Sequence, residues 1–338
     1  MSSSEDAGLA LLSEVRTILE LEDTRVRDEE RAFRWWPHAH AMRFSAGEPR
    51  PDGASVVAAE TLLLEGVPGR GPEFGRIALR NARDPGLSSL RWDSTTAELW
   101  LRAAVIARPG DSLPAAKRLA HAALLQAGEA LRASDALAVE FPDARLATPP
   151  APVAGLPVVE QVEAWQAYAE RAPGLAAGLA ERVSALASVS PAPWLRVSRA
   201  PHGLDAEIAC APPHQQTAPG EGVALLRLSA TQAHPRLGAG LVMVLVPPPA
   251  AEPVAERAAA TSVMLNEAEA REWTGVDALG GWCVHGSVGL SHVTFVPALA
   301  IEDDTVEVLA WQAGVRARWA LAFLQKVAAM RTPGGANG

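Results

Sequence analysis

The chain has 338 residues, of which 49% are hydrophobic, and this is enough apolar surface for two cores of ordinary domain size. Its 30 basic residues (Lys and Arg) against 39 acidic residues (Asp and Glu) give a formal net charge of −9 at pH 7. That charge repels phosphate backbones and anionic lipid unless basic residues gather locally. The densest basic run, VRARWALAFLQK, has the apolar spacing of an ordinary amphipathic helix. We therefore expect neither nucleic acid nor a membrane as a partner.

The cysteines and the first residues indicate a cytoplasmic protein. Only Cys210 and Cys283 occur, and a chain with cores of this size does not require a disulfide. The first residues, MSSSEDAG, lack the basic start and the apolar stretch of a secretory signal. Apolar runs such as GLVMVLV are far shorter than the roughly 20 residues that cross a bilayer.

Hydrophobic periodicity predicts the elements of the first part of the chain. A helix is expected over residues 6–34, followed by strands in RWWPHAHAMRFSA, after its proline, and in SVVAAETLLLEGV. A second helix is predicted over 72–83, because proline is tolerated in the first turn. Strands in LSSLRWDS and ELWLRAAVIA come next, and a long helix begins near Ser112, where Asp111 and Ser112 can cap it.

A proline-rich segment, FPDARLATPPAPVAGLP, separates this part from the next and is predicted to be a linker. Beyond it we expect a helix over 158–189, strands in WLRVSRA, LDAEIACA, GVALLRLSA and AGLVMVLV, a helix over 253–271, strands in GGWCVHGS and LSHVTFVPALA, and a helix over 305–330. The order predicts an α+β fold with mostly antiparallel sheets flanked by helices. The expected organisation is a first domain at 1–140, a linker at 141–157, a second domain at 158–331 and a disordered tail at 332–338.

Two stretches of the chain share one layout. Residues 98–132 and 291–325 align without a gap at an offset of 193 (291 − 98), and each is predicted to form a strand, a short turn and a long amphipathic helix. Asp111 falls on Asp304 at the start of the helix. This pattern predicts a duplicated α+β unit. Two such units in one chain can pack face to face as an internal pseudo-dimer.

The end of each unit also resembles a known family. TSVMLNEAEA, GGWCVHGSVGLSHVTFVPALA and DDTVEVLAWQAGVRARWALAFL follow one another in the order of the type III secretion chaperone and YbjN-like superfamily, in which a helix often carrying Leu-Asn precedes a hairpin and a long closing helix. In the first unit RIALRNARD and the segments after it repeat the order, so that Asn81 matches Asn266. The resemblance implies a scaffold that pairs with itself and binds another protein without catalysis. Here the tandem stands in for the homodimer, and we expect a monomer or a weak homodimer.

Two motifs are candidates for cofactor or metal sites. GVPGRGPEFG, at 66–75, follows a strand and begins a helix as a phosphate-binding loop does, but it has no Gly-Lys-Ser or Gly-Lys-Thr. His38 and His40 lie two apart on a predicted strand, as ligands do in some zinc sites, yet no third ligand can be named. We expect no nucleotide, no other cofactor and no metal.

Two alternatives to protein binding remain open. Cys283 and His285 share a face of one predicted strand, and His292 lies on the next, so a thiol-dependent enzyme could use Cys283 with either histidine. Against it, a cysteine in an apolar strand is usually packed, and no oxyanion-hole segment can be named. The other alternative is a small-ligand sensor with a pocket between the two halves.

Tryptophan is the residue that most often anchors a partner protein, and the chain has ten Trp against one Tyr. The sequence changes character sharply at Trp35 and Trp36, and we expect a partner-binding surface there at a sheet face or groove, formed by Trp35, Trp36, His38 and Arg43. The alternative is that the tryptophans are buried in the core or between the halves. Trp311 and Trp319 share one side of a predicted helix and are expected in the core.

Overall fold

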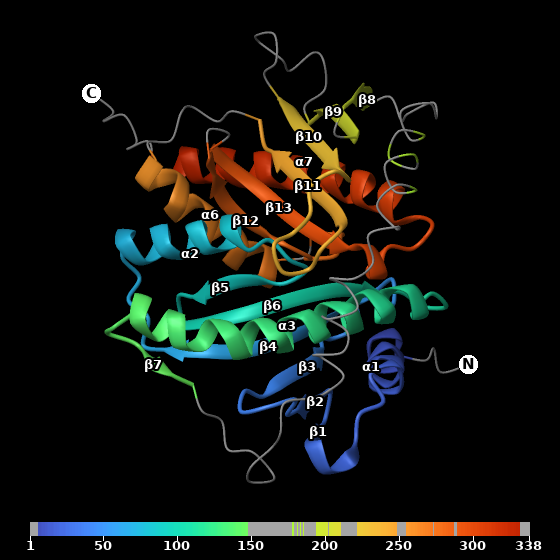
Figure 1. Ribbon diagram of the computed structural model, residues 1–338, viewed down its shortest axis with the longest axis vertical. Helices are drawn as coiled ribbons and strands as arrows, with labels where there is room; N and C mark the ends of the chain where they lie inside the picture. Colours follow the sequence, from blue (N-terminus) through green and yellow to red (C-terminus); the bar gives the residue numbers. More distant parts are fainter. Residues whose placement is uncertain are drawn as a thin grey trace.

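The protein consists of two similar α+β halves, each built on one antiparallel sheet (Figure 1). The computed structural model describes residues 6–147, 178, 181, 183, 185, 194–201, 203–210, 222–248, 255–272, 274–286 and 289–331. The predicted fold class is therefore confirmed. The long linker and the tail lie mostly outside the described residues, as does most of the helix predicted at 158–189.

The first half contains three α-helices and a sheet in which most strands lie beside the strand that follows them in sequence. Its elements are α1 (Ala7–Ile18), β1 (Val26–Glu29), β2 (Ala32–Trp35), β3 (Met42–Ala46), β4 (Ser55–Glu65), α2 (Gly71–Arg83), β5 (Ser89–Asp93), β6 (Glu98–Ala107), α3 (Leu113–Glu140) and β7 (Arg145–Leu146). The strands lie in the order β1-β2-β3-β4-β6-β5, and the short β7 pairs with β4.

The second half repeats these elements in the same order. They are β8 (Leu195–Ala200), β9 (Gly203–Ala209), β10 (Val223–Ser229), β11 (Gly240–Val246), α6 (Ala255–Arg271), β12 (Gly281–His285), β13 (Gly289–Pro297) and α7 (Thr305–Arg331). The strand order β8-β9-β10-β11-β13-β12 matches that of the first half strand for strand. Residues 178, 181, 183 and 185 are helical, and the buried Val183 packs in the core as α1 does in the first half.

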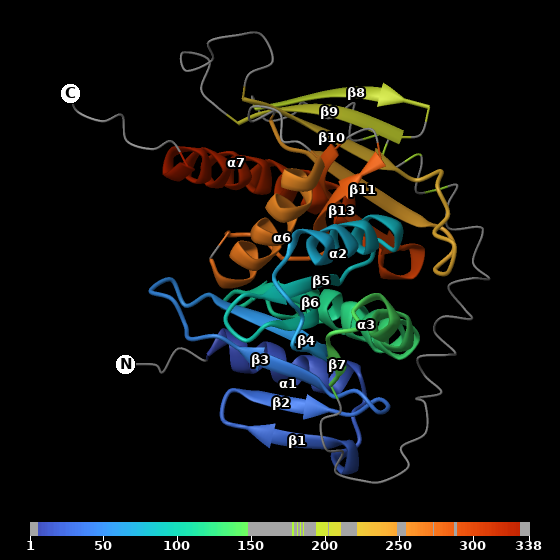
Figure 2. The same cartoon turned by 90° about the vertical axis from the view of Figure 1, so that its left-hand side faces the viewer.

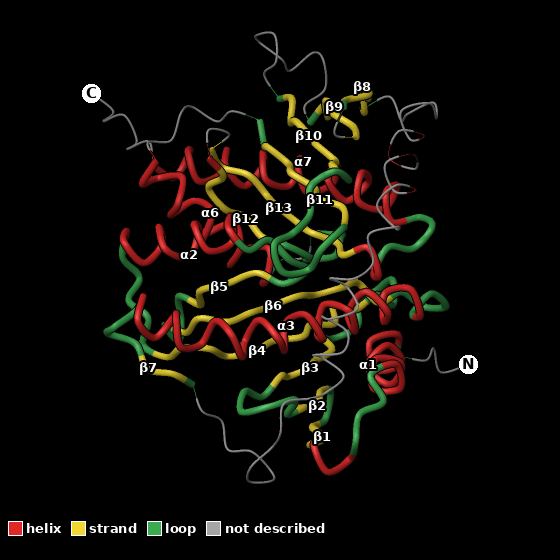
Figure 3. Tube along the Cα trace, in the orientation of Figure 1, coloured by secondary structure: helices red, strands yellow, loops and turns green. Residues whose placement is uncertain are grey.

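In each half the long closing helix covers one face of the sheet. In the first half α1 and α3 pack on β4 and β6, and α3 runs along both strands (Figure 3). Alternate residues of β4 such as Val57 and Ala59 point into this core, and alanines of α3 let the helix approach closely. In the second half α7 packs on β10 and β11. The closing helix does not cover the opposite face of each sheet.

Three predicted elements differ in the structure. The first helix ends at Ile18, because Glu20 adopts a left-handed conformation (φ 48°), and the charged residues that follow form the edge hairpin of β1 and β2. His38 and His40 lie in the connection between β2 and β3 and not on a strand. The predicted linker begins with structure, since β7 pairs with β4.

The core side of α7 also differs from the prediction. Trp311 is 45% exposed, whereas Trp319 is partly buried against the core. The buried side is instead formed mainly by alanines, and it includes the charged Arg316, which is 1% exposed. A face built from small residues carries too weak an apolar signal to compete with tryptophan in a periodicity argument.

The halves meet through the edge strands β5 and β12, and α2 and α6 lie between the two sheets (Figure 2). The other edges, β1 and β8, lie at opposite ends of the molecule. A side chain on Gly281 would collide with Ser89, so the two edge strands approach most closely there. The buried asparagines predicted to be equivalent lie beside this point.

Each asparagine caps the backbone of its own edge strand. Asn81 accepts from the Leu90 N–H (2.8 Å) and donates to the Leu90 carbonyl (3.1 Å). Asn266 does the same with Trp282, at 2.8 Å for both bonds. An edge strand exposes unpaired backbone groups, so these side chains satisfy the strand where burial removes water. Leu90 and Trp282 are therefore equivalent, at an offset of 192 (282 − 90).

This equivalence corrects the gapless alignment. Leu90 pairs with Leu101 and Trp282 pairs with His292, so the offset within β6 and β13 is 191 (292 − 101) and not 193. A shift of two residues keeps every side chain on its own face of a strand. The predicted duplication therefore stands, with a changed register.

Reciprocal backbone contacts then join the halves. In the second half, the loop after α6 places Ala278 beside β6, where Ala104 and Ala278 exchange hydrogen bonds of 3.2 and 2.8 Å. In the first half, the loop after α2 places Gly86 beside β13. The Phe295 N–H donates to the Gly86 carbonyl (3.4 Å). Gly86 and Ala278 are equivalent at the offset of 192. Each loop thus extends the hydrogen bonding of the other half.

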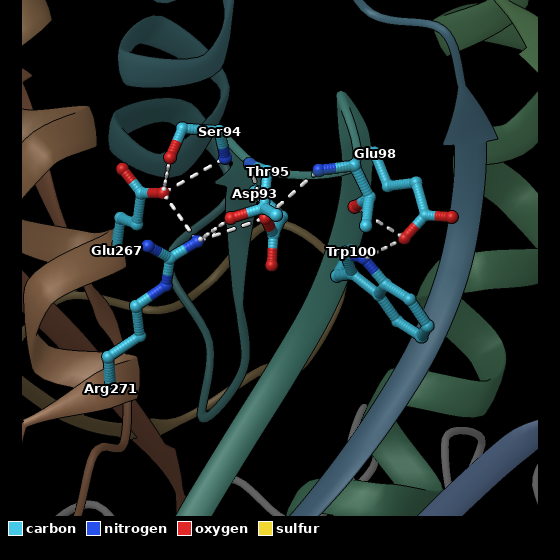
Figure 4. A network of polar contacts seen from close by, with 8 residues as sticks. Asp93, Ser94, Thr95, Glu98, Trp100, Glu267 and Arg271 are labelled. Atoms are coloured by element: carbon cyan, nitrogen blue, oxygen red, sulfur yellow. Dashed lines mark hydrogen bonds and ion pairs between the residues drawn. The ribbon is translucent and has the colours of Figure 1, made fainter.

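A polar cluster closes the same interface at the turn between β5 and β6 (Figure 4). Arg271 of α6 contacts Asp93 (3.0 Å) and the Thr95 hydroxyl (2.9 Å). Glu267 accepts from the backbone N–H and the hydroxyl of Ser94. These groups are partly exposed, so they orient α6 on the turn more than they stabilise it.

Replacing Asn266 with alanine is expected to destabilise the protein by about 2 kcal/mol, because the Trp282 N–H would be left buried without a partner and its carbonyl would keep only the long bond from Asn81 Nδ2 (3.5 Å). Chemical denaturation measures the change. Gln232, an exposed amide, provides the control, and Gln232→Ala should stay within about 0.5 kcal/mol of the wild type. Equal effects of the two substitutions would contradict the capping role.

Candidate binding groove

The structure places the predicted partner-binding residues mainly in the interior. Trp35, Trp36 and His38 are 3%, 2% and 4% exposed. Only Arg43 reaches the surface, where it pairs with Glu29 at 3.2 Å. The alternative of buried tryptophans therefore describes this segment, and a partner surface has to be sought elsewhere.

His38 and His40, the candidate metal ligands in the sequence, instead take part in hydrogen bonds of the connection between β2 and β3. His38 Nε2 lies 2.7 Å from the Ala127 carbonyl, and His38 Nδ1 accepts from the His40 N–H at 3.1 Å. Burial lowers the pKa of His38 to about 4, so the ring is neutral and donates through Nε2. Among the described residues, no three His, Cys, Asp or Glu side chains are grouped as metal ligands.

The glycine-rich segment at 66–75 packs against an aromatic ring. The indole of Trp92 donates to the Val67 carbonyl (3.0 Å) and lies where a side chain on Gly69 would have to stand. The Arg70 side chain does not cap α2. The glycine therefore has a packing reason that needs no phosphate.

The thiol of Cys283 is hydrogen-bonded to a serine, and within the described part of the chain no hydrogen bond joins it to His292 or to His285, which shares its face of β12. In the β12–β13 hairpin Cys283 is opposite Ser291, with Sγ to Oγ 3.7 Å, while His292 is opposite Trp282 and so lies on the other face. Burial raises the pKa of Cys283 to about 11. Burial, with Arg316 and Arg91 nearby, holds the pKa of His292 well below its usual range. This pair is not arranged to produce a thiolate.

Slow thiol labelling is the expected consequence. With a pKa near 11 only about 0.1% of the Cys283 thiol is ionised at pH 8, and Cys210 has the same raised pKa for the same reason, burial. Native protein should react with a disulfide reagent far more slowly than denatured protein, and the rate should rise with pH up to the pKa. Rapid labelling of Cys283 at pH 7 would instead support the thiol-dependent enzyme.

A buried ionic network that the sequence analysis missed joins the two halves. Asp277 accepts from the Ile106 N–H (2.9 Å), from Arg118 of α3 (3.0 Å) and from Gln312 of α7 (3.0 Å). Arg316 donates to the Asp277 carbonyl (2.6 Å) and pairs with Glu269 at 2.8 Å. The partners in this network are distant in sequence. The one signal in the sequence was the position of Arg316 on the apolar side of a predicted helix.

Asp277→Ala should cost about 3 kcal/mol of stability, since it leaves Arg118, Gln312 and a backbone N–H without their acceptor in a buried site. The matched control is Asp23→Ala, because Asp23 pairs with Arg16 at 2.6 Å with 91% of its side chain exposed. That change should stay within about 0.5 kcal/mol. Thermal or chemical unfolding of both variants measures the difference.

The open faces of the two sheets, away from the closing helices, have diverged. Across the first sheet, register places Arg34, Arg43, Glu60 and Arg102 in one row. Glu60 pairs with Arg102, and Glu29 pairs with both Arg34 (2.7 Å) and Arg43 (3.2 Å). The row therefore forms a ladder of cross-strand ion pairs.

The equivalent row of the second sheet is apolar at its centre. Counted outward from Ser89 and Gly281, Arg102 corresponds to Val293 and Glu60 corresponds to Val244. Only the outer positions remain charged, as Arg227 and Asp205, which pair at 2.9 Å. Two valines of the second half thus occupy the positions of an ion pair of the first.

A groove of about 730 Å³ lies over this apolar row. Its floor is formed by residues of β10, β11 and β13, including Leu225, Val242, Val244, Val246 and Phe295. Leu225 is 53% exposed. One wall is the end of α2 from the first half, so both halves build the site. The equivalent groove of the first sheet measures about 290 Å³, and its lining includes the charged Glu60, Arg102 and Arg271 beside small and apolar residues such as Val56 and Ile106.

Comparison with known proteins does not assign this groove. A scan against protein-family models and searches of curated proteins and of solved structures found no match. Within the described part of the chain, no helix is both long and apolar enough to span a membrane.

Proposed function

We propose that the chain is a non-catalytic binding protein that holds an apolar segment of another polypeptide in the groove over its second sheet. The observation that carries this proposal is the contrast between the two rows. In the first half the open face is closed by Glu60 and Arg102, and in the second Val244 and Val293 leave it apolar. Burial of such a surface by a partner is favourable in proportion to the apolar area removed from water.

The rim of the groove favours a polypeptide as the occupant. Arg196 pairs with Glu207 (3.3 Å) and Arg227 with Asp205 (2.9 Å), so an apolar floor is bordered by polar groups. This is the usual anatomy of a protein interface. The groove is also continuous with the interface between the halves, because Pro85 of its wall immediately precedes Gly86, which bonds to Phe295.

The resemblance to type III secretion chaperones and YbjN-like proteins supports the same proposal, since that superfamily implies client binding by paired α+β units. Here the pairing is internal. The second unit supplies the sheet, and the first supplies α2 as a wall. The second unit alone would lack this wall.

A small ligand with an apolar body is a second candidate. The volume of about 730 Å³ falls within the usual range for small-molecule pockets, and the groove lies between the halves. It differs from the first proposal in the size of the bound molecule.

Photo-crosslinking from within the groove distinguishes these occupants. A photoreactive amino acid replaces Leu225 in the full chain, and the matched control carries it at Leu79, which is on α2 and is 54% exposed against 53% for Leu225. Position 225 should give a discrete, protein-sized adduct in the native cell, and position 79 should not.

Adding Val244→Asp to the Leu225 probe should abolish that adduct, because a carboxylate in the floor opposes apolar contact. Equal adducts from positions 225 and 79 would contradict the groove as the binding surface. An adduct of only a few hundred daltons from position 225 would replace the polypeptide by the small ligand.

A further inference from the structure

The groove is lined by a basic side chain and by a histidine ring nitrogen that has no acceptor among the described residues. These belong to Arg83, the last residue of α2, and His234, in the connection between β10 and β11. Arg236 pairs with Asp84 at 2.9 Å and so ties the two segments together. The position of the two side chains is therefore held by contacts between the halves.

His234 offers a donor whose tautomer is set by the backbone. Its Nδ1 accepts from the N–H groups of Arg236 and Leu237, both at 3.1 Å. The proton of the neutral ring therefore lies on Nε2, and burial keeps the ring neutral by lowering its pKa to about 4. His234 is 6% exposed, and its Nε2 has no hydrogen-bond partner among the described residues. A buried donor of this kind is costly unless an acceptor is supplied.

Arg83 adds a positive charge on an exposed side chain. Its neighbour Arg80 pairs with Asp84 and Glu140, both at 3.5 Å, but Arg83 has no ion pair within the described part of the chain. The carboxylates that line the groove, Asp205 and Glu207, are already paired with arginines. The last turn of a helix favours a cation, which accounts for Arg83 but not for the free donor of His234.

We propose that Arg83 and His234 form a carboxylate-binding site next to the apolar residues in the groove. This rests on the proposed function and specifies its partner: a polypeptide segment with an Asp or Glu side chain beside its apolar side chains. The carboxylate accepts from the Arg83 guanidinium and from His234 Nε2, while the apolar side chains cover Val244 and Leu225. A charge-assisted bond of this kind is stronger than a neutral one.

Two fluorescent dyes separate the charge from the apolar surface. Anilinonaphthalene sulfonate is an apolar anion, and phenylnaphthylamine is its uncharged relative. In titrations of the full chain, Arg83→Gln should weaken binding of the sulfonate about fivefold and leave the uncharged dye unchanged. Arg83→Lys should restore most of the difference. Arg27→Gln is the matched control, because Arg27 is exposed on β1, far from the groove, and it should change neither dye.

The variants also separate this inference from the proposal on which it rests. Val244→Asp should weaken both dyes, since it removes the apolar floor. If Val244→Asp weakens both dyes but Arg83→Gln weakens neither, the proposal of a carboxylate-binding site is contradicted, whereas the apolar groove is supported. If Val244→Asp leaves the uncharged dye unaffected, the groove itself is wrong.

Discussion

The structure depends on covering the inner edge of each sheet. Strands β5 and β12 end their sheets at the centre of the molecule, and their outward N–H and C=O groups need partners where water is excluded. Asn81 and Asn266 satisfy these groups locally. The loops at Gly86 and Ala278 then bond across to the other half. Each half thus supplies backbone partners to the other at this interface.

The same constraint explains where a binding site can arise. With the inner edges closed and one face of each sheet covered by a helix, the opposite faces remain. The first is closed by ion pairs between cross-strand neighbours, which cost little to keep in water. The second has valines at the equivalent positions, Val244 and Val293. Val293 is itself only 3% exposed, so the apolar surface left open on this face comes from neighbours such as the half-buried Val244 and Leu225, which is 53% exposed.

The sequence predicted most elements of the fold because their local signals agreed with the tertiary structure. Strand β6 and helix α2 were predicted to within a residue, since alternation and helix-start signals mark them clearly. The hairpin of β1 and β2 was missed because its polar edge residues have no apolar alternation. The repeat could have supplied it, since β8 and β9 were predicted in the second half. The burial of Trp35 and Trp36 could not be predicted, because it arises only through tertiary packing.

The groove shows why periodicity alone does not locate a site in a duplicated chain. Val242, Val244 and Val246 alternate with the core residues Leu241, Met243 and Leu245, so β11 is apolar on both faces. In sequence this is the pattern of a strand covered on both sides. At the register of the structure, β11 is equivalent to β4, which carries Glu60 at the position of Val244 and on the same face. In the proposed function, the binding surface is defined by the difference between the two copies. That difference becomes apparent only when the hydrogen-bond register shows which residues correspond.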